Sequence, residues 1–106
     1  MAEIYKRLRI GNDILAEITI SSGTHNLDEV NWECLFYTDG KNIVKILKSD
    51  SYRVDSNHYI VPVSTSEFNE GILQAYLQVE LPNAYFKDGF KTEIVDINIE
   101  KMWLFK

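Results

Sequence analysis

The run from Ile72 to Leu81 constrains the fold more than any other stretch of the chain. Every odd-numbered residue in it is apolar, whereas most of the even-numbered residues are polar. Successive residues of a strand point to opposite faces of a sheet, so this alternation is typical of a half-buried β-strand. The rest of the chain must therefore supply an apolar surface that covers the odd-numbered face.

Similar alternation recurs at intervals of roughly ten residues, which is the spacing of short antiparallel strands. The Asp39-Gly40 dipeptide between two such runs is a strong hairpin signal. The predicted strands, besides the run above, cover Ile4–Ile10, Ile14–Ile20, Trp32–Thr38, Ile43–Lys48, His58–Ser64 and Val95–Phe105.

The segment between Ser64 and Gly71 breaks this alternation. Ser64 and Glu67 have the spacing of a helix capping box, Phe68 can fill the core from a single helical turn, and Gly71 can end that turn. We therefore predict an all-β protein. It is expected to be an antiparallel immunoglobulin-like β-sandwich of about seven strands, with one short helical turn near residues 65–70.

Length and charge limit the classes of function. A chain of 106 residues suits one domain, predicted to span residues 1–106. The net charge is −5 and the eleven basic residues are scattered, so we expect no nucleic-acid partner. No apolar run approaches the ~18 residues of a membrane span, and the N-terminus lacks the apolar region of a signal peptide. We expect synthesis in the cytoplasm, with no membrane partner.

The residues that could carry chemistry do not form a known motif. His25, His58 and Cys34 lack metal-ligand spacing, and the stretch from Asp50 to Asn57 lacks the EF-hand pattern. There is no Gly-x-Ser-x-Gly elbow and no phosphate-binding loop. A single cysteine cannot form an internal disulfide, and Cys34 is expected to be an inert core thiol. We therefore predict a non-enzymatic protein without a metal or cofactor.

The outward side of the strands suggests a protein interface. Apolar and aromatic residues between polar ones are typical of such a surface, although single apolar residues are also common on monomers. The loop after the Ile72–Leu81 strand offers a second contact through Tyr85, Phe86 and Asp88. The candidate interface residues are Ile60, Ile72, Gln74, Tyr76, Gln78 and Ile94.

Three segments together resemble a family of small immunoglobulin-like domains in tailed-phage virion proteins. They are Arg9–Ile14, which opens an alternating strand, Tyr59–Leu77, which has the order strand, turn, glycine and strand, and the loop Phe86–Glu93 with its Asp-Gly pair. The family includes the N-terminal domain of baseplate upper proteins and short proteins from phages and prophages of gut bacteria.

This resemblance implies a building block of a phage or prophage particle, in the tail, the baseplate, or a head decoration or head fibre. Its implied partners are other virion proteins and further copies of itself, and its implied location is the virion. The alternative is a carbohydrate-binding β-sandwich module, with a surface glycan as its partner. The aromatic candidates for stacking on a sugar are Trp32, Tyr37, Tyr85 and Trp103, although a tryptophan in a strand is expected to be buried.

Overall fold

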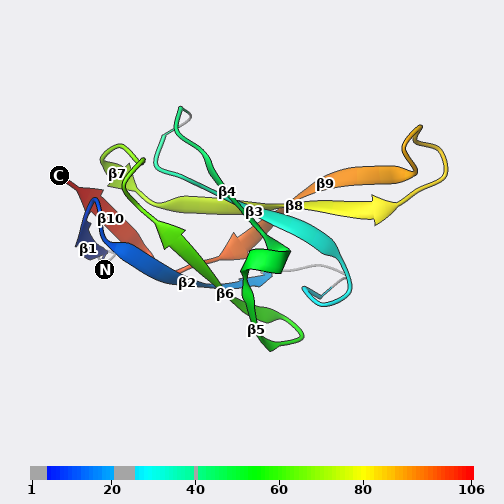
Figure 1. Cartoon of the computed structure of the whole chain (residues 1–106), viewed down its shortest axis with the longest axis horizontal. Coiled ribbons are helices and arrows are strands. Elements are labelled where there is room, and N and C mark those ends of the chain that lie inside the picture. Colours follow the sequence, from blue (N-terminus) through cyan, green and yellow to red (C-terminus); the bar gives the residue numbers. More distant parts are fainter. Residues whose placement is uncertain (1–4, 21–25, 40) are drawn as a thin grey trace, which may run out of the picture.

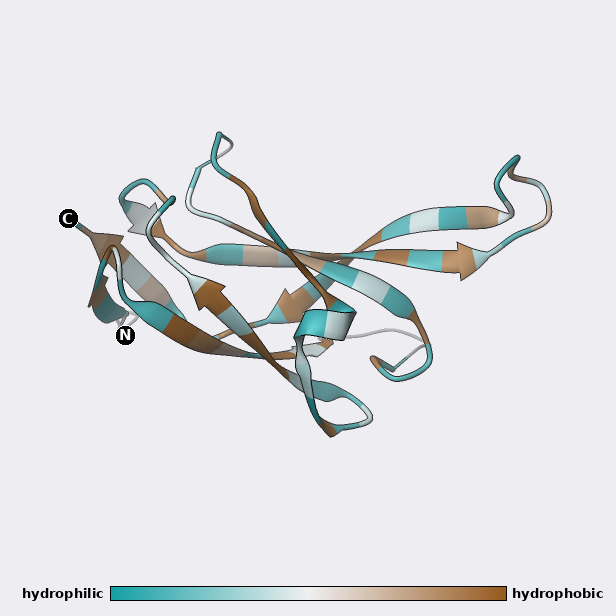
Figure 2. Ribbon diagram, in the orientation of Figure 1, coloured by the Kyte–Doolittle hydropathy of each residue, from teal (hydrophilic) through white to brown (hydrophobic). Residues whose placement is uncertain are grey.

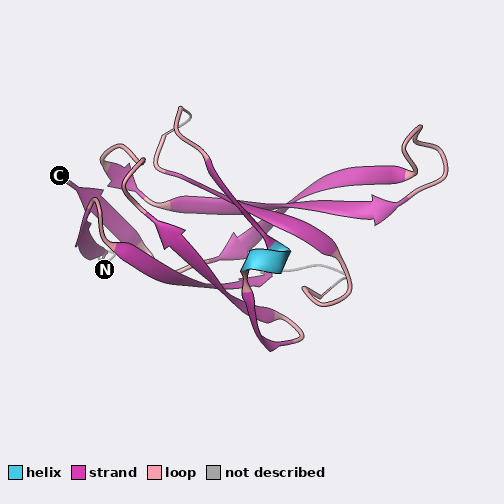
Figure 3. Ribbon diagram, viewed as in Figure 1, coloured by secondary structure: helices cyan, strands magenta, loops and turns pink. Residues whose placement is uncertain are grey.

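The computed structural model describes residues 5–20, 26–39 and 41–106. Those residues form an all-β protein with ten strands, mostly antiparallel, and one short 3-10 helix, as Figures 1 and 3 show. The elements are β1 (Lys6–Arg9), β2 (Asp13–Ile20), β3 (Asn31–Tyr37), β4 (Val44–Leu47), η1 (Lys48–Asp50), β5 (Tyr52–Asp55), β6 (His58–Ser64), β7 (Gly71–Ile72), β8 (Gln74–Pro82), β9 (Phe90–Asn98) and β10 (Met102–Phe105).

Seven of the strands form one sheet, and three short ones form another. The large sheet has the order β4-β3-β8-β9-β2-β6-β5 and curls into a half-barrel. The small sheet has the order β1-β10-β7, and its β1–β10 pair is parallel. The predicted all-β, mostly antiparallel class is confirmed, but the number of strands exceeds the seven or so expected.

The strand predicted over Ile72–Leu81 is divided between the two sheets at Leu73. Residues Gly71 and Ile72 pair with β10, and the Leu73 N–H donates to the Met102 carbonyl at 2.9 Å. From Gln74 onward the chain pairs with β3 instead. The alternation of side chains continues through this change, so the sequence pattern alone could not reveal it.

The inner face of the curled sheet forms one core. Residues spaced by two supply it from β2, β3, β6 and β8, and Figure 2 shows brown apolar bands recurring along these ribbons. The alternation predicted these inward residues for β2, β6 and β8. The small sheet and the loops complete the core. The buried apolar residues are Ile14, Ala16, Ile18, Leu27, Val30, Trp32, Cys34, Phe36, Tyr59, Val61, Val63, Phe68, Leu73, Leu77, Val79, Met102 and Leu104.

The two tryptophans differ in their surroundings. Trp32 is buried, and its indole N–H donates to the Leu27 carbonyl at 3.1 Å. Its ring also meets the ring of Tyr59 edge-on, with centroids 5.3 Å apart, which joins β3 to β6 across the core. Trp103 is 39% exposed, contrary to the expectation of burial, because its neighbours in β10, Met102 and Leu104, occupy the inward positions.

The helical turn expected near residues 65–70 is a β-turn. The Phe68 N–H donates to the Thr65 carbonyl at 3.1 Å, and Ser64 remains in β6, paired with Asp13, rather than capping a helix. Phe68 still fills the core as predicted. The 3-10 helix of the described residues, η1, lies instead between β4 and β5.

Thr65 explains why this turn is not helical. Its buried hydroxyl accepts a hydrogen bond from the Gly11 N–H at 2.9 Å and donates one to the Asn12 carbonyl at 2.7 Å. These bonds fix the turn to the β1–β2 connection, which lies more than fifty residues away in the sequence.

An ionic cluster fixes the loop before β3. The carboxylate of Asp28 accepts a hydrogen bond from the Tyr59 hydroxyl at 2.7 Å and from the Arg53 Nε at 2.9 Å. Lys48 donates from its ammonium to the Asp28 and Val30 carbonyls at 3.1 and 2.8 Å. The hydrogen bond from the Tyr59 hydroxyl is the main cause that lowers the pKa of Asp28, and Arg53 lowers it further. The pKa of Tyr59 is raised, mainly by burial and secondly by its hydrogen bond to Asp28.

We predict that Thr65→Val lowers the free energy of unfolding by about 1–3 kcal/mol, because it leaves the Gly11 N–H without its acceptor. It also removes the shorter of two hydrogen bonds to the Asn12 carbonyl, which then keeps only the one from the backbone N–H of residue 65. Thr65→Ser keeps the hydroxyl and loses one methyl group, at a cost of about 0.8 kcal/mol. Urea unfolding of the three proteins measures both effects. A valine variant as stable as the serine variant would contradict this role.

We predict that Asp28→Asn lowers the melting temperature at neutral pH. Since the folded-state pKa of Asp28 lies below its ordinary 3.8, its stabilising effect is complete above that value and is lost as the pH falls through the folded-state pKa. Thermal unfolding over a pH series should therefore show the gap between the two proteins closing below 3.8. Glu29→Gln, at the neighbouring exposed carboxylate, is the control, and a gap independent of pH would refute the prediction.

Candidate interaction surface

The β8–β9 hairpin projects from the body of the molecule. Its ladder runs from Tyr76 opposite Asp96 to Pro82 opposite Phe90, and Figure 1 shows its far end extending beyond every other strand. The molecule measures 46 × 27 × 27 Å, and its radius of gyration of 14.7 Å exceeds the roughly 13 Å typical of a compact chain of this length. The hairpin accounts for this elongation, because its outer part lies beyond the curled core.

The loop at the end of the hairpin, residues 83–89, is closed by its own hydrogen bonds. The Asn83 N–H donates to the Gly89 carbonyl at 2.8 Å, and the Gly89 N–H donates to the Phe86 carbonyl at 2.9 Å. Gly89 has a φ of +84°, a conformation that strongly favours glycine. The Asn83 side chain also accepts from the Tyr85 N–H at 2.9 Å. The loop is therefore held in a defined shape.

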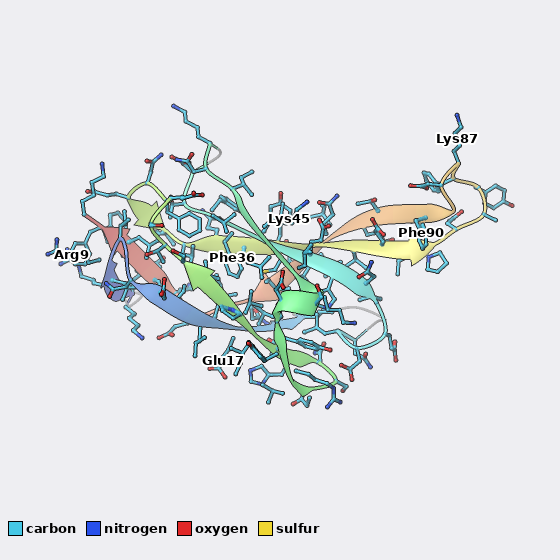
Figure 4. The ribbon with its side chains drawn as sticks, in the orientation of Figure 1. Arg9, Glu17, Phe36, Lys45, Lys87 and Phe90 are labelled. Carbon is cyan, nitrogen blue, oxygen red and sulfur yellow. The ribbon has the colours of Figure 1, made fainter. Side chains whose placement is uncertain are left out.

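This loop presents its aromatic residues to solvent. Tyr85 is 98% exposed and Phe86 is half exposed. Phe90, at the start of β9, is 45% exposed, and its N–H donates to the Asp88 carboxylate at 3.1 Å. Figure 4 labels Lys87 and Phe90 at the far end of the hairpin, well away from the buried Phe36. The predicted loop contacts Tyr85, Phe86 and Asp88 thus share one projecting tip.

The outer face of β8 and its neighbours brings together four of the six predicted interface residues. Gln74, Tyr76 and Gln78 follow one another at even positions of β8, and Ile94 of β9 lies opposite Gln78. Ile94 is 62% exposed. The even-numbered positions therefore form a continuous surface over these two strands, as the alternation predicted.

The other two predicted interface residues lie elsewhere. Ile72 belongs to the small sheet, where it pairs with Trp103. Ile60 belongs to β6, and strand β2 separates β6 from β9 in the sheet order. Each residue does face outward, but the strand order was needed to assign them to different surfaces.

The structure adds residues that sequence reasoning missed. Strand β3 places Leu35 opposite Tyr76, and Tyr37 stacks edge-on against Tyr76 with ring centroids 5.9 Å apart. The Tyr37 hydroxyl also donates a hydrogen bond to the Gln74 Oε1 at 3.4 Å. Phe90 extends the outer face toward the tip. Its parity with Ile94 in β9 was the signal that could have identified it.

Ile60 belongs to a second outward apolar group. It lies opposite Tyr52 of β5, which is 66% exposed, and two residues from Pro62. Pro62 in turn lies opposite Leu15 of β2, which is 68% exposed. This group is separate from the outward surface over β8 and β9.

The ionisable residues considered as chemical candidates serve other contacts. Burial raises the pKa of the Cys34 thiol to about 12, which keeps it protonated. The His58 Nε2 lies 3.2 Å from the Glu17 carboxylate, and His25 lies outside the described residues. Within the described ranges, no group of three or more histidine, cysteine, aspartate or glutamate side chains could hold a metal ion. The predicted core position of Cys34 is confirmed.

An open depression lies beside β3 and η1. Glu33, Glu80 and Lys48 line it, together with five other residues. Glu33 lies 3.7 Å from Lys45 as an ion pair, and the Lys48 ammonium donates to two loop carbonyls as described above. Two of these three charges are thus engaged with the protein itself.

Across the part of the chain that the structure describes, no helix has the length and apolar character needed to cross a membrane. Comparison of the whole chain with protein-family models, curated proteins and solved structures finds no match.

Proposed function

We propose that this chain is a non-enzymatic structural protein that assembles a bacteriophage or prophage particle through protein–protein contacts. The observation that carries the proposal is the projecting β8–β9 hairpin, whose apolar side chains face solvent from a closed loop. Tyr85, Phe86, Phe90 and Ile94 are all large, apolar or aromatic, and at least 45% exposed.

Such a hairpin has the composition of a docking element. Aromatic side chains are enriched in protein interfaces and carry much of their binding energy. The hydrogen bonds from Asn83 and Gly89 hold the loop in shape before any partner arrives. Docking therefore costs less conformational entropy than it would for a loop that orders on binding.

The phage setting comes from the sequence resemblance. The Phe86–Glu93 segment of that resemblance coincides with the hairpin tip and the start of β9, and Tyr59–Leu77 covers β6, the turn at Thr65 and the start of β8. We extend the proposal to the fold: the curled sheet is a variant of the immunoglobulin-like sandwich, with its two halves packed through Trp32 and Tyr59. The proposed partners are other virion proteins and further copies of the chain, and the proposed location is the tail, baseplate or head surface.

A carbohydrate-binding module is the second candidate. The nearly complete exposure of Tyr85 favours it, because an exposed aromatic ring can stack on a sugar. The polar groups beside it favour it less, since the Asn83 Oδ1 and the Asp88 Oδ1 already accept backbone hydrogen bonds within the loop. Assembly through protein contacts is therefore the better supported function.

We predict that particles released by bacteria carrying this gene contain the chain at a fixed ratio to their major structural proteins. We also predict that Tyr85→Ala combined with Phe86→Ser removes it from the particles, because the tip loses its aromatic contacts. Quantitative mass spectrometry of gradient-purified particles measures both.

Ile43→Ser is the control, since Ile43 is an exposed apolar residue just before β4, outside both outward apolar surfaces, and its loss should leave incorporation unchanged. Absence of the unaltered chain from the particles would refute the proposed function. Glycan binding that is lost on Tyr85→Ala would instead favour the carbohydrate-binding module.

A further inference from the structure

Among the described residues, the outer half of β9 has an open edge. From Phe90 to Ile94 it pairs with β8 on one side, and no strand among the described residues pairs with it on the other. As far as the structure describes the chain, strand β2 joins that second side at Ile97 and Asn98. An unpaired strand edge presents a row of N–H and C=O groups that can pair with another strand.

The register of the hairpin identifies the groups that face this edge. Pro82 has no N–H, so the Pro82–Phe90 pair cannot exchange both backbone hydrogen bonds, whereas Asn83 next to it donates to Gly89. Hydrogen-bonded and non-hydrogen-bonded pairs alternate along an antiparallel ladder. Phe90, Thr92 and Ile94 therefore direct their N–H and C=O groups away from β8 and toward the open edge. Of these groups, the Phe90 N–H already donates to the Asp88 carboxylate.

The side chains along this edge complement those of the same strand in a second copy that runs antiparallel to it. In an antiparallel pair with a twofold axis at Thr92, Lys91 lies opposite Glu93 of a second copy, and Phe90 lies opposite the second copy's Ile94. A shift of the axis by one residue places either two Glu93 carboxylates or two Lys91 ammonium groups opposite each other. Like charges in directly opposite positions are unfavourable, so the charges select the register centred on Thr92.

The two faces of such a pair also differ in a favourable way. Lys91 and Glu93 lie on one face, where the Lys91 Nζ is already 3.1 Å from the Glu93 carboxylate, so two copies form a ring of four alternating charges. Phe90 and Ile94 lie on the other face, exposed by 45% and 62%. Pairing places each of them against an apolar residue of the second copy.

We propose that two copies of this chain form a twofold-symmetric dimer, in which the β9 strands pair in antiparallel fashion with Thr92 on the axis. The dimer joins the two hairpins into a four-stranded sheet in the order β8-β9-β9-β8. A lysine on an edge strand usually prevents such pairing, but here its counter-charge lies opposite it in the second copy. The inference names one partner for the proposed assembly function and rests on that function for its biological setting.

Sedimentation equilibrium of the purified full chain tests the dimer. The unaltered protein is expected to approach twice its 12.3 kDa mass. Lys91→Glu alone and Glu93→Lys alone should each weaken dimerisation by about tenfold or more, since each places like charges opposite each other twice. The double exchange, Lys91→Glu with Glu93→Lys, should restore it. Failure of the double variant to recover would overturn the proposed register.

A backbone variant tests the pairing itself. Thr92→Pro removes an N–H that points away from β8, so the hairpin keeps its ladder while the open edge loses its central donor. We expect a monomer for this variant and a dimer for Thr92→Val, which keeps the N–H and suits a strand. Circular dichroism and thermal unfolding check that both variants fold. A folded Thr92→Pro dimer, or an unaltered protein that stays monomeric at the highest soluble concentration, would overturn the proposal.

The test of the dimer can fail or succeed independently of the test of the proposed function. Dimerisation is measured on the purified chain in solution, whereas the assembly role is measured by incorporation into particles. A dimer that is absent from particles would refute the phage role alone, and a monomer that enters particles would refute the dimer alone.

Discussion

The contact between the two halves of the curled sheet is the interaction on which the rest of the structure depends. Trp32 of β3 and Tyr59 of β6 meet edge to face in the core, although three strands, β8, β9 and β2, separate β3 from β6 in the sheet order. The polar end of each ring also has a partner, the Leu27 carbonyl for the indole N–H and the Asp28 carboxylate for the phenol. Two large side chains are thus buried with their polar atoms satisfied, which is what makes their burial favourable.

The same packing explains why the hairpin projects. The buried positions of β8, Leu77 and Val79, lie toward the body, whereas the strand continues to Pro82 and the paired β9 begins at Phe90. Beyond Val79 the chain has few buried residues, so the outer part of the hairpin contributes little to the core. A segment that is exposed, closed by its own hydrogen bonds and rich in aromatic residues is better suited to a contact with another molecule than to stabilising this one.

The exposed edge and the exposed tip of the hairpin belong to different kinds of recognition. The edge of β9 offers backbone groups and a charge order that complements itself, which suits a second copy of the same strand. The tip offers the side chains of Tyr85 and Phe86, which suit a surface of different shape. One hairpin can therefore serve two contacts, because backbone and side chains point in different directions.

The sequence by itself determined the all-β class, the faces of β2, β6 and β8, and the burial of Cys34 and Phe68, because alternation and apolarity are local properties. It also placed Tyr85 and Phe86 in a loop. Only the tertiary structure decided that Leu73 changes sheets, that Thr65 bonds to the Gly11–Asn12 turn instead of starting a helix, and that Ile60 and Ile72 lie apart from Tyr76. Those outcomes depend on pairing between distant strands, and alternation with a period of two assigns each residue to a face without specifying which strand lies beside it.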